Sequence, residues 1–137
     1  VAAGLAALEV IISQDLASQA QHAGQQLREL FNKKITEFGI ADVVGDVRGH
    51  GLAIGIDLVT DRDSNNRNND LARKTVYRAW ELGVVVYYVG ANVLEVTPPL
   101  TIQEHELVQG VHIIAQAIAD AKAGLVTDEM VAAFTGW

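Results

Sequence analysis

The spacing of apolar residues along this chain changes from a helical period to a strand period and back again. From residue 16 to 38 apolar side chains recur every three or four positions, which places them on one face of a helix. From 52 to 58, Leu and Ile alternate with small or polar residues, as in a strand with one buried face. Helical spacing returns from 71 to 82. The chain is therefore predicted to combine helices with a sheet.

The flanking segments extend this pattern. Ala, Leu and Glu dominate residues 2–10, and these residue types favour a helix. The β-branched and aromatic run 84–89 and the segment 92–96 predict two strands joined by a short turn. Because so short a turn cannot carry the chain back to a parallel position, the two strands should pair antiparallel.

The second of these strands ends at Pro98-Pro99, where the chain must leave the sheet. Thr101 and Glu104 have the spacing of a capping box, which predicts the start of a last helix. Together the elements predict an α+β fold, in which a small, mostly antiparallel sheet is covered by helices.

Composition narrows the possible functions. The chain has 137 residues, of which 50% are hydrophobic, and this is enough for one domain with a core. It has no cysteine, which excludes disulfides, thiol nucleophiles and cysteine-bound zinc. A net charge of −7 disfavours nucleic acid as a partner. No apolar run approaches the roughly 20 residues of a membrane helix, so we expect no membrane partner and a cytoplasmic location.

The segment Arg48-Gly49-His50-Gly51 could be interpreted as a glycine loop that binds phosphate. A dinucleotide-binding loop would need a third glycine where Ile54 stands, and a helix should follow it. We therefore expect a glycine-dependent kink or bulge in a strand.

Other polar groups favour structural roles. The loop from Asp61 starts like a calcium-binding loop, but Asn66 stands at the glycine position and Ala72 at the position of the last ligand. The four histidines lack metal-binding spacing. The four lysines all lie in predicted helices, and we expect ordinary surface groups. They are Lys33, Lys34, Lys74 and Lys122.

Glu95 stands out as a single acid within an apolar predicted strand. If Leu94 and Val96 face the core, Glu95 points to the other side of the sheet. Such an acid commonly protects a sheet edge against aggregation. From the residues alone, the chain has no nucleophile-base pair, metal cluster or cofactor loop, and it is predicted to be an acidic α+β domain without a catalytic centre of its own.

Three segments nevertheless resemble one family. They are Ala6-Ala7-Leu8-Glu9-Val10-Ile11, the stretch from Val47 to Val59 with its Arg-Gly-His-Gly, and Asn92-Val93-Leu94-Glu95-Val96-Thr97-Pro98-Pro99-Leu100-Thr101-Ile102. In this order and at this spacing, they are similar to the C-terminal small domain of class III aminotransferases, which are fold type I enzymes dependent on pyridoxal 5'-phosphate. The group includes 4-aminobutyrate aminotransferases. The resemblance covers residues 1–123 and leaves 124–137 as a tail without a counterpart.

The resemblance implies that the chain is a fragment of a longer enzyme, beginning inside a helix at Val1. In the family the preceding large domain supplies the lysine that binds the cofactor, so the isolated fragment is expected to bind no cofactor and to be inactive. The parent is expected to be a homodimer that uses pyridoxal 5'-phosphate and acts on small amines and keto acids. Structural roles are implied for Arg48, Gly49, Gly51, Pro98 and Pro99.

The same resemblance marks Glu95 as a substrate-binding position. In many members an arginine stands there and binds a substrate carboxylate through two hydrogen bonds. Glu95 reverses this charge, which implies an amino donor of the ω-amino acid or amine type, similar to 4-aminobutyrate, whose cationic or hydroxylated group faces Glu95. Two alternatives remain open: an amino-acid racemase or epimerase of the same family, and a free-standing α+β module that binds a ligand.

Overall fold

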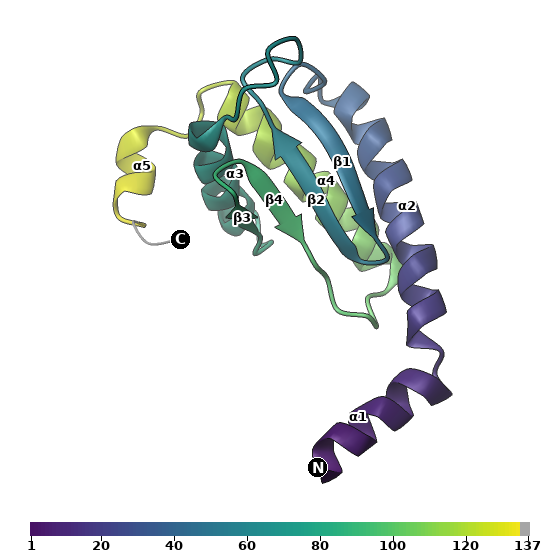
Figure 1. The fold of residues 1–137 in the computed structure, drawn as a ribbon. Helices are drawn as coiled ribbons and strands as arrows, with labels where there is room; N and C mark the ends of the chain where they lie inside the picture. The colour runs from purple at the N-terminus through teal and green to yellow at the C-terminus, as the bar shows by residue number, and fades with distance from the viewer. Residues whose placement is uncertain (135–137) are drawn as a thin grey trace.

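The structure, a computed structural model, describes residues 1–134 (Figure 1). A four-stranded sheet is combined with helices in the order α1-α2-β1-β2-α3-β3-β4-α4-α5. The helices are α1 (Ala2–Ser13), α2 (Leu16–Glu37), α3 (Asn69–Glu81), α4 (Glu104–Lys122) and α5 (Asp128–Ala132). The strands are β1 (Val44–His50), β2 (Ala53–Leu58), β3 (Tyr87–Val89) and β4 (Val93–Val96). The predicted α+β class is confirmed.

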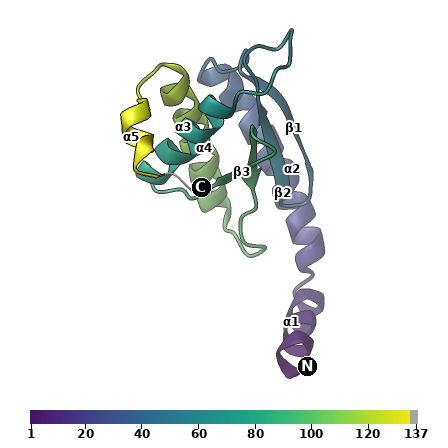
Figure 2. The ribbon, with the colours of Figure 1, turned by 60° about the vertical axis from the view of Figure 1, so that its left-hand side comes forward.

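The sheet has the strand order β1-β2-β4-β3, and all neighbouring strands pair antiparallel. Helices α2, α3 and α4 lie on one face of it (Figure 2). Among residues 1–134, no helix covers the opposite face, which we call the open face. The fold therefore has two layers, one of helices and one of strands, and the sheet has one buried and one accessible face.

The buried layer follows from the alternation in β2 and the helical periods. Ile54, Ile56 and Leu58 are at most 2% exposed and point toward the helices. They pack in one cluster with Phe31 of α2 and Ile118 of α4, both fully buried. Burying a side chain of this size contributes about 1.5–3 kcal/mol, so this cluster holds the helices to the sheet.

The segment Arg48-Gly49-His50-Gly51 is neither a kink nor a bulge, and that prediction is wrong. It ends β1 and begins a tight turn into β2, with His50 paired to Ala53 across the hairpin. Gly51 has a φ of +53°, a conformation that this kind of two-residue turn requires. The alternation in β2 was visible in the sequence, but β1 was not distinguished as a strand because its outward residues are mostly polar or glycine.

Two predicted boundaries also differ. Only Tyr87–Val89 of the predicted strand 84–89 pairs with β4, and the three valines before it belong to no strand. The helix predicted after Pro99 is α4, which begins at Glu104. Its capping partner is Glu106, whose carboxylate accepts a hydrogen bond from the Gln103 amide at 2.9 Å. Because the Ile102 amide bonds to the Pro99 carbonyl, Thr101 lies in a turn before the helix.

The predicted tail contains helix α5, which packs against α3. Thr127 caps it by accepting a hydrogen bond from the Met130 amide. Arg73 of α3 donates to Asp128 at 2.7 Å, and the ring of Tyr77 contacts that of Phe134. Residues 135–137 of the tail lie outside the described residues.

Helix α1 extends away from the rest of the molecule (Figure 1). It is rich in Ala, Leu, Ile and Val, yet none of its residues is buried among residues 1–134. Leu5, Leu8 and Ile12 expose between 51% and 70% of their surface. Within the part of the chain that the structure describes, no helix combines the length and the apolar character needed to span a membrane.

Candidate functional site

Glu95 lies on β4 with its side chain on the open face, while its neighbours Leu94 and Val96 are buried. The orientation expected from the sequence is thus the observed one. Its direct partners across the sheet are Gly55 of β2 and Tyr87 of β3. Arg48 of β1 stands opposite Gly55, so a single row crosses the open face: Arg48, Gly55, Glu95, Tyr87.

The carboxylate of Glu95 has no hydrogen bond or ion pair with any residue between 1 and 134. The nearest cation in its row, Arg48, is two strands away, or roughly 10 Å at the usual strand spacing. Arg48 is already bound by Asp57 and Asp46, at 3.1 and 3.2 Å. These hydrogen bonds, above all the one that Arg48 donates to Asp57, raise the pKa of the Arg48 guanidinium, which therefore stays charged.

Asp57 is in turn fixed from the other side. The buried amide of Asn92 donates to the Asp57 carboxylate at 2.5 Å and to the Leu58 carbonyl at 2.8 Å. Asp57 is therefore shared between Arg48 and Asn92, and this network occupies the β1 side of the open face. Glu95, on the β3 side, remains available to a ligand.

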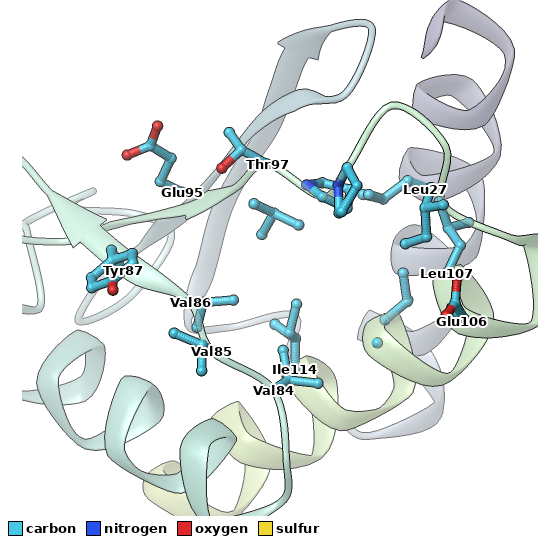
Figure 3. A pocket seen from close by; sticks show the side chains of 16 residues that line it. Leu27, Val84, Val85, Val86, Tyr87, Glu95, Thr97, Glu106, Leu107 and Ile114 are labelled. Atoms are coloured by element: carbon cyan, nitrogen blue, oxygen red, sulfur yellow. The ribbon is translucent and has the colours of Figure 1, made fainter. Parts of the chain in front are cut away.

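A cavity of about 360 Å³ lies beneath the edge of the sheet, between β4 and helices α2 and α4. Its wall is mostly aliphatic, with valines of the segment 84–86 and Leu27, Leu107 and Ile114 of the helices. Figure 3 shows the Glu95 carboxylate at the rim of this cavity, pointing away from its centre. Among the described residues that line it, Glu95 and Glu106 are charged, and none is Lys, Arg or His.

The residues to which the resemblance gave structural roles lie at the end of β1, in the hairpin turn that follows it, and after β4. A side chain at Gly49 would overlap the backbone of Ala53 in the hairpin, and Arg28 of α2 donates to the Gly49 carbonyl at 3.1 Å. Gly51 lies against Ala20 of α2. Pro98 and Pro99 line the cavity and lead from β4 into the turn before α4.

Tyr87 was not singled out from the sequence, although it lies beside Glu95. It is part of an apolar run in which nothing distinguishes it from Tyr88. Only the register between β3 and β4 shows that Tyr87 faces Glu95 while Tyr88 pairs with Leu94. Tyr87 could have been found only from the register between the two strands.

The lysines and histidines take surface positions. Lys34, Lys74 and Lys122 form ion pairs with nearby carboxylates, and Lys33 is exposed. All four histidines are exposed, and residues 1–134 contain no group of three potential ligands that could hold a metal ion.

Comparison with known proteins gives a consistent result. The family model described as aminotransferase class-III matches residues 1–118. The chain is 42% identical to a leucine/methionine racemase of Thermococcus litoralis over 98% of its length, which is 30% of that racemase. It is 31% identical to an alanine/serine racemase of Pyrococcus horikoshii, covering 95% of the chain and 27% of the relative. It is 34% identical to a 4-aminobutyrate aminotransferase of Escherichia coli, covering 88% of the chain and 28% of that relative.

Solved structures give the same fold. A Bacillus anthracis aminotransferase matches with a TM-score of 0.77 and 30% identity, over 83% of this chain and 26% of that one. An omega transaminase from Pseudomonas jessenii in complex with PMP matches with a TM-score of 0.73 and 29% identity, over 85% of this chain and 25% of that one. The chain thus spans less than a third of the length of the relatives that it matches.

Proposed function

Because this chain belongs to the class III aminotransferase family, we propose that it is the C-terminal small domain of a longer enzyme dependent on pyridoxal 5'-phosphate. Residues 1–123 form the domain and 124–137 its tail. The share of the relatives that the chain covers, about 30% in the first of them, supports a larger parent. In that parent the domain would supply the open face and Glu95 as part of the substrate-binding wall.

The residues of this chain do not fit the cofactor by themselves. A lysine that binds pyridoxal 5'-phosphate is normally desolvated within a pocket. Here no described lysine lines the cavity, and three of the four are paired with carboxylates at the surface. We infer that the cofactor-binding lysine belongs to another part of the parent, and that this chain alone is inactive.

The reaction that we favour is the racemisation or epimerisation of an amino acid. The observation that carries it is the Glu95 carboxylate, which has no partner among residues 1–134, while the one cation in its row, Arg48, is bound by two aspartates. A transaminase that uses a dicarboxylic keto acid must bind a second carboxylate, for which this wall offers no free cation among the described residues. A racemase needs a single amino acid and no keto acid. The 42% identity to a racemase supports the same reaction.

A second candidate is transamination from an ω-amino acid or amine similar to 4-aminobutyrate. The 34% identity to a 4-aminobutyrate aminotransferase and the structural similarity to an omega transaminase favour it. Glu95 would then face a cationic or hydroxylated group of the amino donor. In either case we expect a cytoplasmic homodimer whose partners are small molecules.

Product analysis of the full-length enzyme separates the two. With one enantiomer of an amino acid and no keto acid, a racemase produces the other enantiomer continuously, and the amino-acid concentration stays constant. A transaminase in the same assay stops after about one turnover per active site, and it continues only when a keto acid is added. The second result would exclude racemisation.

Glu95→Arg tests the role of the side chain. The substituted arginine could bind a carboxylate through two hydrogen bonds, so the preference of the full-length enzyme should shift toward substrates with a second carboxylate. Glu95→Gln is the matched control, because it removes the charge without adding a cation. An unchanged ratio of kcat/KM between glutamate and leucine in Glu95→Arg would contradict the assignment.

A further inference from the structure

The side chain beside Glu95 on the open face is aromatic. Tyr87 and Glu95 are directly paired across β3 and β4, and direct partners in an antiparallel sheet project from the same face. Their Cβ atoms in such a pair are about 4.5–5.5 Å apart. Tyr87 is 53% exposed.

On the other flank of Glu95, the partner residue across the sheet has no side chain of its own. Its partner there is Gly55, and a methyl group of Val93 lies 3.0 Å from the position that a Cβ of residue 55 would take. A group that approaches the carboxylate would therefore lie between the Tyr87 ring on one side and the Gly55 backbone with the Val93 methyl on the other. The floor of this space is the sheet itself.

A carboxylate beside an aromatic ring has the chemistry to bind an organic cation. The carboxylate attracts the positive charge, and the negative face of the ring adds a cation–π contribution. A dicarboxylate would instead be repelled by Glu95. The network of Arg48, Asp46 and Asp57 carries a net negative charge, so it does not oppose a cation at this place.

We propose that Tyr87 is a second specificity-determining residue, and that Tyr87 and Glu95 together bind a distal ammonium group of the substrate. The assignment rests on the proposed function, because it places this domain at a substrate-binding wall. It refines that function by naming the substrate class: an amino acid or amine that carries an additional cationic group.

The test measures equilibrium binding to the full-length holoenzyme. Choline and 3,3-dimethyl-1-butanol have the same shape, differ in charge, and lack an amino group that could react with the cofactor. Titration calorimetry of the two gives the preference for a cation without any turnover. We expect choline to bind more tightly, and Glu95→Gln to abolish the difference.

Tyr87→Leu should reduce the preference for choline by about five-fold, while Tyr87→Phe, which keeps the ring, should leave it unchanged. Val89→Ala is the matched control, because Val89 is exposed on the same strand but pairs with Val93 instead of Glu95. Equal affinities of the two ligands for the unmodified enzyme, or the same preference in Tyr87→Leu as in the unmodified enzyme, would overturn the proposal.

Kinetics give an independent readout. Lysine and norleucine differ by a distal ammonium. The kcat/KM for lysine divided by that for norleucine should fall in Tyr87→Leu but not in Tyr87→Phe. An equal loss of kcat/KM for both substrates in Tyr87→Leu counts against the assignment. A failure of the proposed function has a different signature. An enzyme that transaminates instead of racemising would still bind choline in preference to its neutral analogue if Tyr87 and Glu95 form the subsite.

Discussion

The guanidinium of Arg78 on α3 donates to the carboxylate of Asp120 on α4 at 2.7 Å, and the Asp120 side chain is only 8% exposed. Gln116 donates to the other oxygen of the same carboxylate at 2.6 Å. Asp120→Ala would leave the Gln116 amide and the Nε of Arg78 without their acceptor at a largely buried position, although Arg78 would keep its ion pair with Glu81. We expect it to lower the free energy of unfolding by about 2–4 kcal/mol, measured by urea denaturation.

Asp128→Ala is the control for this prediction. Asp128 also binds an arginine of α3, but its side chain is 73% exposed. Its loss should cost at most about 1 kcal/mol, because exposed ion pairs contribute little. Equal destabilisation by the two variants would contradict the role assigned to burial.

Gly24 of α2 touches the hairpin turn so closely that a side chain there would overlap the carbonyl group of Gly51. Glycine to alanine within a helix normally stabilises it by about 1 kcal/mol. We expect Gly24→Ala to be destabilising instead, because the backbones of α2 and of the hairpin turn would have to move apart. Gly110→Ala on α4 is the matched control, since open space surrounds that position and the usual stabilisation should appear in thermal unfolding.

Lys122 at the end of α4 binds the loop after α2, donating to Asp42 and to the carbonyl of Gly39. The hydrogen bond from Lys122 is the main cause that holds the pKa of Asp42 below its ordinary value of 3.8. The stabilisation by the Asp42 carboxylate is therefore complete above pH 3.8 and is lost as the pH falls through the lower pKa of the folded protein. Lys122→Met should raise the pKa of Asp42 in an NMR titration.

The exposed Lys33 provides the comparison for this titration. Lys33→Met removes the same charge without touching Asp42 and should leave its pKa unchanged. If Lys33→Met and Lys122→Met raised the pKa equally, overall charge rather than the hydrogen bond would be the cause.

Helix α1 exposes apolar side chains on all sides, and such surfaces promote association. The double substitution of Leu8→Glu and Ile12→Lys should reduce self-association of this chain in sedimentation velocity experiments. Its free energy of unfolding should change by less than about 0.5 kcal/mol, because neither residue packs on the core. Leu27→Glu, which places a charge at a position 2% exposed, should unfold the chain. Unchanged self-association of the double variant would show that the apolar side chains of α1 do not cause it.

Periodicity predicted most of the elements, because one-sided burial imposes a regular pattern on the residues of a helix or strand. The long helix before Gly39 and the helix α4 after Pro99 are confirmed, as is the antiparallel pairing of the segments on either side of Gly90. The capping-box rule failed where a turn and a helix start follow each other closely in the sequence. Thr101 and Glu104 have capping-box spacing, but the turn from Pro99 moves the helix start to Glu104.

The sequence by itself determined the α+β class, the buried faces of α2, β2 and α4, and the outward direction of Glu95 from its strand. Only the tertiary structure decided what surrounds Glu95. Gly55 and Tyr87 are 40 and 8 residues away along the chain, and the strand order β1-β2-β4-β3 places them on its two sides. The physical reason is that register between strands is set by hydrogen bonding and by the packing of a whole layer, which no single segment encodes.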